Sequence, residues 1–179
     1  MDVKQLQHNF INEEIWILTF GGGFQRANIY CNNPDKDVRQ KLRSFIKSIV
    51  ETLFTKSYKD NEVESDAHIK NIIALKAEID SRFSTILTNR RITFGVVQKL
   101  LNLYLKYQWC MGGSSIPPHC PVDRIILTKA KVTPLPNWTM IDSPEEYQLC
   151  INALVRASSK DGKKLAEWEL SEFGRRSNY

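Results

Sequence analysis

One short segment of this chain gathers side chains that could carry out acid–base chemistry. Within six consecutive positions, His119, Cys120, Asp123 and Arg124 supply an imidazole, a thiol, a carboxylate and a guanidinium. Asp123 stands at the predicted start of a short helix, where it could act as the acid of a nucleic-acid-processing site, with His119 as a second catalytic candidate. In the alternative interpretation Asp123 only stabilises the helix dipole, Arg124 lies at the surface and Cys120 is packed.

The loop that carries these residues, 112–121, allows two further chemistries. Its prolines and glycines predict a rigid, exposed segment. Cys110, His119 and Cys120 could ligate zinc, but adjacent His and Cys rarely reach one tetrahedral ion and no second ligand pair exists. A Cys120 thiolate activated by His119 would require neighbouring side chains to converge, although neighbours on an extended chain point apart. The sequence therefore predicts no metal site and no cofactor.

The stretch TFGVVQKLLNLYLKYQW, residues 93–109, is the element that must position this loop. Its apolar side chains fill both i,i+4 ridges of a helix, so the rest of the protein must cover most of its circumference. Gln98, Lys99, Asn102 and Lys106 form one narrow polar strip. The strip either faces a ligand or is a solvated seam on a buried helix. Asn102 is the residue least compatible with the solvated seam, because a buried amide needs hydrogen-bond partners.

The positive charge of the chain is concentrated around this central helix. The net charge is +5, yet residues 88–131 carry seven basic residues and one acid, so the rest of the chain is close to neutral. A clustered positive field recruits polyanions through phosphate contacts. The residues predicted to contact nucleic acid are Arg90, Arg91, Lys99, Asn102, Lys106, Arg124 and Lys129.

Flanking segments predict further helices. Apolar residues at helical spacing cover 37–54, where Lys41, Arg43 and Lys47 fall on the solvated side, and about 66–87. After Lys131, a proline-rich segment is predicted to run extended over the surface, with Trp138 buried in the core. A capping box at 143–146 then predicts the start of another helix. A final helix covers 164–173, and residues 175–179 are predicted to be a loose tail.

Residues 1–33 allow two interpretations. Positions 15–20 could form a buried strand that ends at the glycines 21–23, or a helix capped by Asn12 that continues through 24–30 beyond a glycine interruption. We favour the helix, because a lone short strand would have no evident partner. The glycines lack the spacing of a phosphate-binding loop and predict a turn or a close helix crossing.

These elements predict the fold class and the compartment. We expect residues 1–179 to form a single all-α domain, a helical bundle or orthogonal helical array around the central helix. The N-terminus has no basic segment before an apolar core and no apolar run reaches membrane-spanning length, so we expect a cytoplasmic protein with no membrane partner. The cysteines are scattered, and we expect reduced, mostly buried thiols at Cys31, Cys110, Cys120 and Cys150.

Two resemblances involve the second half of the chain. From Phe94 onward, the sequence resembles an uncharacterised family of small bacterial cytoplasmic proteins, which brings no established activity. The residues that carry this pattern are Gln98, Lys99, Asn102, Lys106, Tyr107, His119, Pro121, Asp123, Ile126, Trp138, Asp142 and Tyr147. Val122, Asp123 and Arg124 are also similar to the helix-hairpin-helix DNA glycosylase superfamily, a resemblance that implies a helical fold and an aspartate that assists base excision.

Two functions from different classes follow. The first is a nucleic-acid-binding protein, with a base-excision-like enzyme as its catalytic form, in which the basic residues meet phosphates and Asp123 is the catalytic group. The second is a non-catalytic interaction or scaffold protein, in which the proline-rich loop 112–121 and exposed aromatic side chains meet a partner protein.

Overall fold

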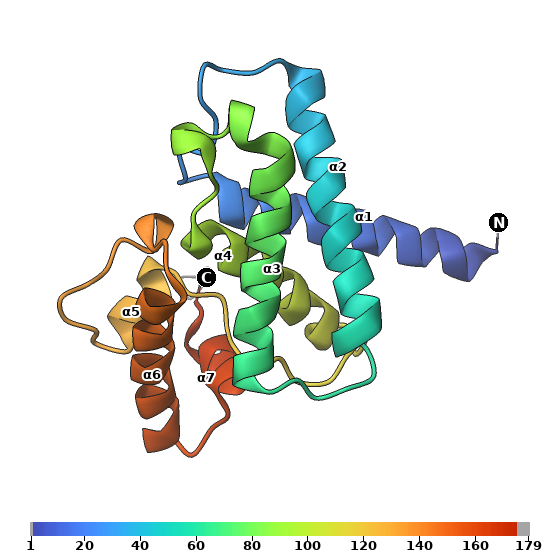
Figure 1. The fold of residues 1–179 in the computed structure, drawn as a ribbon. Helices are drawn as coiled ribbons and strands as arrows, with labels where there is room; N and C mark the ends of the chain where they lie inside the picture. Colours follow the sequence, from blue (N-terminus) through green and yellow to red (C-terminus); the bar gives the residue numbers. More distant parts are fainter. Residues whose placement is uncertain (1, 175–179) are drawn as a thin grey trace.

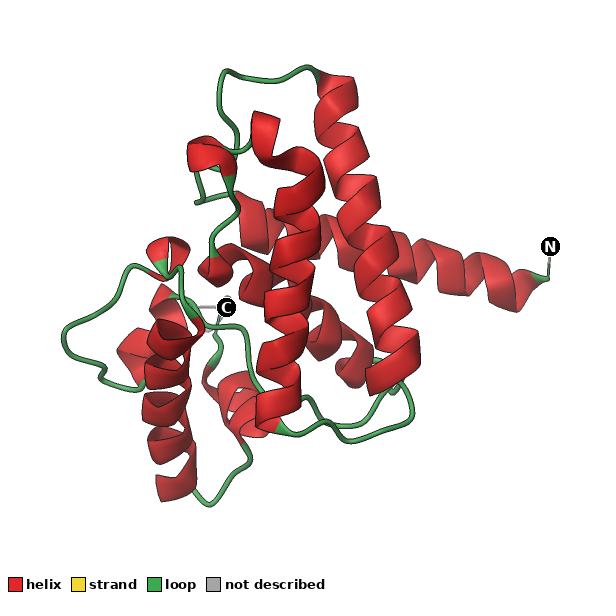
Figure 2. Cartoon of the chain, in the orientation of Figure 1, coloured by secondary structure: helices red, strands yellow, loops and turns green. Residues whose placement is uncertain are grey.

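The computed structural model describes residues 2–174, and these form an all-α helical array (Figures 1 and 2). The described range contains no strand, and its sole β-bridge pairs Tyr30 with Leu87. The helices are α1 (Val3–Phe24), α2 (Lys36–Leu53), α3 (Ser65–Phe83), α4 (Phe94–Cys110), α5 (Arg124–Lys129), α6 (Pro144–Lys160) and α7 (Leu165–Glu172). The predicted loose tail, 175–179, lies outside the described residues.

Helix α4 is the buried centre of the array, as its sequence predicts. The Thr93 side chain accepts a hydrogen bond from the Val96 amide, so Thr93 is the predicted N-cap. Helices α1, α3 and α6 pack against α4, which Figure 1 shows enclosed by its neighbours. Because helices cover it on several sides, only Tyr107, Trp109 and Cys110 of α4 are not buried.

Helix α1 crosses α4 closely, and glycine makes the crossing possible. A Cβ atom at Gly23 would lie 2.5 Å from Leu100 Cδ2, so any larger residue would require the Leu100 side chain to move. The helix at 15–20 and the close crossing are therefore confirmed. The predicted cap at Asn12, the glycine interruption and the continuation through 24–30 are wrong, because α1 runs unbroken from Val3 to Phe24.

Helices α2 and α3 run antiparallel beside each other over α4 (Figure 1). The predicted apolar face of α2 is buried through Leu42, Ile46 and Val50. A π-helical turn, Phe54–Tyr58, extends α2. Helix α3 ends earlier than predicted, and two short 3₁₀ turns lead into α4.

The C-terminal third packs α5, α6 and α7 into a group beside α4. The predicted capping box of α6 is present, since Ser143 accepts from the Glu146 amide and Glu146 accepts from the Ser143 amide. The proline-rich crossing buries Trp138 against α4, as predicted. At this contact a Cβ on Gly95 would lie 1.8 Å from the Trp138 carbonyl oxygen.

Two predictions about exposure are wrong. The loop 112–121 is not an exposed connection throughout, because Pro117, His119 and Cys120 are buried against the helices. The four cysteines are free thiols as expected, but burial holds for only two of them, since Cys110 is exposed and Cys31 is half-buried.

Candidate functional site

The polar strip of α4 is buried. Gln98, Lys99, Asn102 and Lys106 expose between 0% and 8% of their surface. The strip is therefore not a solvated seam, because the segment 119–123 and α7 bring polar partners onto it. Gln98 shows how this works: its amide donates to the Val122 carbonyl and accepts from the Val122 N–H, which fastens the loop to α4.

Lys99 and Asp123 form a nearly buried ion pair. Lys99 Nζ lies 2.6 Å from Asp123 Oδ2, while Asp123 Oδ1 accepts from the Ile126 amide at 3.0 Å and so caps α5. Burial lowers the pKa of Lys99, and the Asp123 carboxylate opposes that shift. Asp123 therefore stabilises the start of α5, which is the structural role predicted as the alternative to catalysis. It is also the counter-charge of Lys99.

Lys106 and Glu169 form the second buried pair. Lys106 Nζ lies 2.9 Å and 2.7 Å from the two carboxylate oxygens of Glu169, and 4.3 Å from the centre of the Phe173 ring. Burial raises the pKa of Glu169, whereas the lysine lowers it. With Glu169 in contact, Lys106 is held inside the protein and does not face solvent as a phosphate contact would.

His119 belongs to a buried hydrogen-bond chain. Its Nε2 lies 2.8 Å from Ser65 Oγ, and its Nδ1 lies 2.9 Å from the hydroxyl of Tyr147. Asn102 donates to the same hydroxyl at 3.0 Å. Burial lowers the pKa of His119 to about 4, so the ring is neutral at pH 7 with both nitrogens engaged. This arrangement suits a structural group better than a proton donor to substrate.

A second histidine extends this chain. The His68 and His119 rings meet edge to face, with centroids 4.7 Å apart, and His68 Nδ1 lies 2.8 Å from the Tyr58 hydroxyl. Burial lowers the pKa of His68 strongly, and the neighbouring His119 lowers it further. Among the described residues, no atom meets hydrogen-bond geometry with His68 Nε2 or Asn102 Oδ1.

The structure brings three predicted residues together in a hollow of about 470 Å³, the Lys99 hollow. Lys99, Asp123 and Arg124 line it together with Arg26, which follows α1, and with the Trp138 ring, which lies 5.8 Å from Lys99 Nζ. His119 instead lies in the buried chain. The predicted catalytic residues Asp123 and His119 therefore do not share this hollow, although their sequence positions are close.

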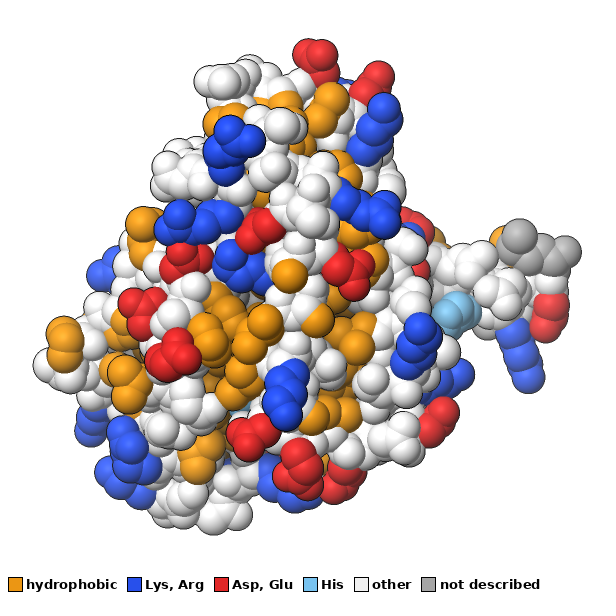
Figure 3. All heavy atoms as spheres, in the orientation of Figure 1, with side chains coloured by type: hydrophobic (Ala, Val, Ile, Leu, Met, Phe, Trp, Pro, Cys, Tyr) orange, Lys and Arg blue, Asp and Glu red, His pale blue; other side chains and the backbone are white. Residues whose placement is uncertain are grey.

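The remaining predicted phosphate contacts lie at the surface. Arg90 and Arg124 are exposed. Arg91 lies 2.6 Å from Asp142, and Lys129 lies 3.6 Å from Glu172. On the face in Figure 3, basic and acidic side chains are interspersed. Acids from elsewhere in the chain thus offset much of the positive charge that is clustered in the sequence.

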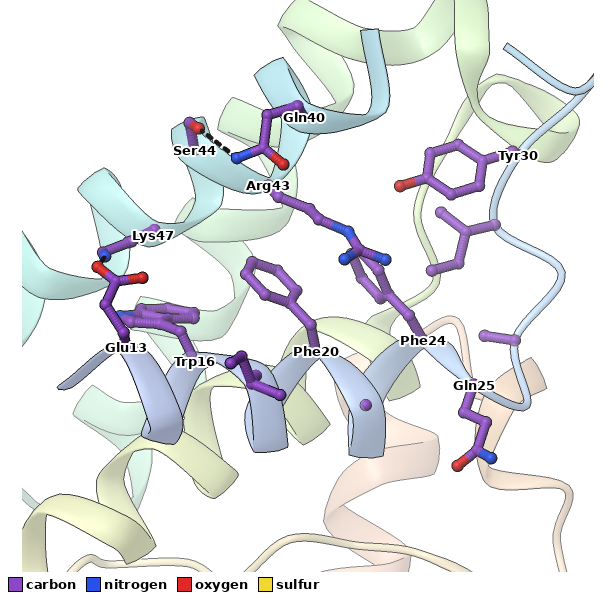
Figure 4. Close-up of a pocket in the computed structure, with 14 residues that line it drawn as sticks. Glu13, Trp16, Phe20, Phe24, Gln25, Tyr30, Gln40, Arg43, Ser44 and Lys47 are labelled. Atoms are coloured by element: carbon purple, nitrogen blue, oxygen red, sulfur yellow. Dashed lines mark hydrogen bonds and ion pairs between the residues drawn. The ribbon is translucent and has the colours of Figure 1, made fainter. Parts of the chain in front are cut away.

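A larger groove of about 700 Å³ lies between α1 and α2, and we call it the α1–α2 groove (Figure 4). Its floor contains Trp16, Phe20 and Phe24 of α1. Arg43 of α2 covers this floor, with its guanidinium carbon 5.4 Å and 5.9 Å from the Phe20 and Phe24 ring centres. Lys47 pairs with Glu13 at one end. The groove combines an aromatic floor with a basic wall.

The N-terminal part of α1 projects beyond the rest of the array (Figure 1). Val3, Leu6, Phe10 and Ile17 expose 65%, 53%, 65% and 63% of their surface, and we call these four side chains the α1 face. At roughly 100° per residue these four side chains lie on one side of the helix. Ile17 also lines the α1–α2 groove, so the face and the groove are adjacent. The apolar spacing 3, 6, 10, 17 is the signal in the sequence that indicates this face.

No family model, no curated protein and no solved structure matches this chain. The resemblances based on residue patterns therefore stay predictions. Among the described residues, no helix is long and apolar enough to cross a membrane. In the same part of the chain, no group of three or more His, Cys, Asp or Glu side chains is placed to hold a metal ion.

Proposed function

We propose that this protein is a non-catalytic interaction module that binds a partner protein through the α1 face and the α1–α2 groove. The observation that carries the proposal is the exposure of Val3, Leu6 and Phe10 on a helix that projects from the body. A helical segment of about ten residues is marginal in water by itself, so apolar side chains on it suit a helix that is covered in use.

The groove supports the same function. Aromatic and arginine side chains dominate the energetics of protein interfaces, and Phe20, Phe24 and Arg43 lie together beside the α1 face. The loop 112–121 is a poorer partner surface than the sequence implies, because half-buried and buried residues occupy most of it. The proposed interface therefore lies on the N-terminal helix α1 and not on the loop 112–121 that the sequence patterns favour.

A substitution on the α1 face tests the function. Phe10→Asp places a charge on the α1 face at an exposed position, so the fold should be retained while partner binding is lost. The wild-type chain, Phe10→Asp and the control Leu149→Asp are each immobilised and exposed to lysate from the producing cells. Leu149 is 70% exposed on α6, so its variant controls for loss of any surface apolar group. Equal capture by the wild type and Phe10→Asp would refute the proposal.

The Lys99 hollow favours a second candidate, the nucleic-acid-binding function. Arg26 and Arg124 line the hollow with Lys99, and one carboxylate, Asp123, opposes them. Binding of labelled DNA at two salt concentrations tests this candidate, since two phosphate contacts imply a log–log slope of about −2. Arg124→Ala should weaken binding, whereas the control Arg156→Ala on α6 should not. Absence of binding at low salt would remove this candidate.

If DNA binds, the base-excision activity is tested separately. Asp123→Asn keeps a side chain that can cap α5 but removes the carboxylate. Loss of base release with retained DNA affinity and retained folding would support catalysis by Asp123. Retained base release would exclude it.

A further inference from the structure

We propose that the partner of the α1 face is a second copy of this chain, with the two α1 helices antiparallel about a two-fold axis near Phe10. This inference rests on the proposed function, because it names the occupant of the same surface. An isologous contact of this kind requires a patch that is complementary to itself. The argument uses the position of the patch, its area and its charges.

The position of the α1 face allows a second helix to lie along it. From Val3 to Ile17 the face is about 21 Å long at 1.5 Å per residue. Antiparallel pairing about Phe10 places Val3 of one copy beside Ile17 of the partner subunit, which is the mouth of the α1–α2 groove. The bodies of the two copies then lie on opposite sides of the two-fold axis.

The area of the α1 face is sufficient for a stable dimer. With exposed fractions of 53–65% and about 170 Å² for a fully free residue of this size, the four side chains present about 400 Å² per copy. Two copies would bury about 800 Å² of apolar surface. Homodimer interfaces are about 65% apolar, so the total is about 1,200 Å², the lower limit for a specific, stable interface.

The charges favour the antiparallel arrangement. The exposed end of α1 carries Asp2. In the antiparallel pair, Asp2 approaches the basic wall formed by Arg43 and Lys47 of the partner subunit. A parallel pair would instead place Asp2 beside Asp2, and like charges at this position repel.

Solution mass tests the inference. The chain is 20.7 kDa, so sedimentation of the wild type should show a species of twice that mass that dissociates on dilution. Phe10→Asp should weaken dimerisation by about 100-fold or more, since it buries two charges opposite each other. The control Leu149→Asp should dimerise as the wild type does. Dimerisation that survives Phe10→Asp, or is lost in Leu149→Asp, would overturn the inference.

Cysteine cross-linking tests the orientation. In a background with Cys31→Ser and Cys110→Ser, Phe10→Cys should oxidise to a disulfide-linked dimer, because a two-fold axis near residue 10 brings the two thiols together. Val3→Cys alone should not cross-link, but a mixture of Val3→Cys and Ile17→Cys should. Cross-linking of Val3→Cys with itself would contradict the antiparallel pair.

The outcomes separate the two proposals. A wild type that stays monomeric at high concentration, together with partner capture that depends on Phe10, would overturn the second copy as the occupant and leave the interaction function supported. If the wild type is monomeric and Phe10→Asp captures the same proteins as the wild type, both the interaction function and the second copy as occupant would be overturned.

Discussion

The buried histidines should make the stability of this protein depend on pH, and His119→Gln is the substitution that tests this. A glutamine can still bond to Ser65 and to the Tyr147 hydroxyl, which hold the two ring nitrogens of His119. It cannot take up a proton. The variant therefore removes the titration while keeping polar partners in the buried chain.

The sign and size of the effect follow from the pKa of His119. In the folded protein burial lowers it to about 4, whereas an unperturbed histidine has 6.5. Between these values the unfolded chain binds the proton and the folded chain does not, so the free energy of unfolding falls as the pH drops below 6.5 and the loss is complete near pH 4. The gap corresponds to about 3 kcal/mol, with a slope of at most about 1.4 kcal/mol per pH unit.

His68 acts in the same direction, because burial also lowers its pKa. The wild type should therefore lose stability from two histidines as the pH falls below 6.5, and His119→Gln should lose it from one. The variant should show a smaller histidine-dependent slope than the wild type. Carboxylates that titrate at the acid end affect both proteins alike, so they cancel in the comparison.

Urea unfolding followed by tryptophan fluorescence at several pH values measures this slope. His8→Gln is the matched control, because His8 is the third histidine of the chain and lies exposed on α1. The control should reproduce the slope of the wild type. A wild type whose stability is flat from pH 6.5 to 5, or an unchanged slope in His119→Gln, would show that the histidines are not buried in the neutral form.

Two further substitutions test the packing and the buried charge. Gly95→Ala should lower the free energy of unfolding by about 3 kcal/mol or more, because the added Cβ would lie 1.8 Å from a backbone oxygen. The control Gly21→Ala should not destabilise the protein, because its Cβ would meet nothing within 4 Å. Asp123→Asn should cost about 3 kcal/mol in urea unfolding by leaving Lys99 buried without its counter-charge. The double variant Lys99→Met, Asp123→Asn should recover most of that loss, and no recovery would refute the ion-pair explanation.

Local patterns in the sequence determined most of the helices. The i,i+4 spacing of apolar residues predicted α2, α3 and α4, and the caps at Thr93 and Ser143 placed two helix starts correctly. These signals are reliable because a helix cap or an amphipathic face involves residues only a few positions apart. The start of α1 at Val3 was not predicted, because the first turns of the helix project beyond the core and leave their apolar side chains exposed.

The chemistry of the polar residues was decided by tertiary structure alone. The sequence shows that Lys99 and Lys106 share a strip, but not that Asp123 and Glu169 would meet them from 24 and 63 positions away. Long-range contacts of the same kind offset much of the positive charge that the sequence concentrates in residues 88–131. A periodic pattern reports which side chains share a face, whereas burial, pKa and net field depend on what other segments place against that face.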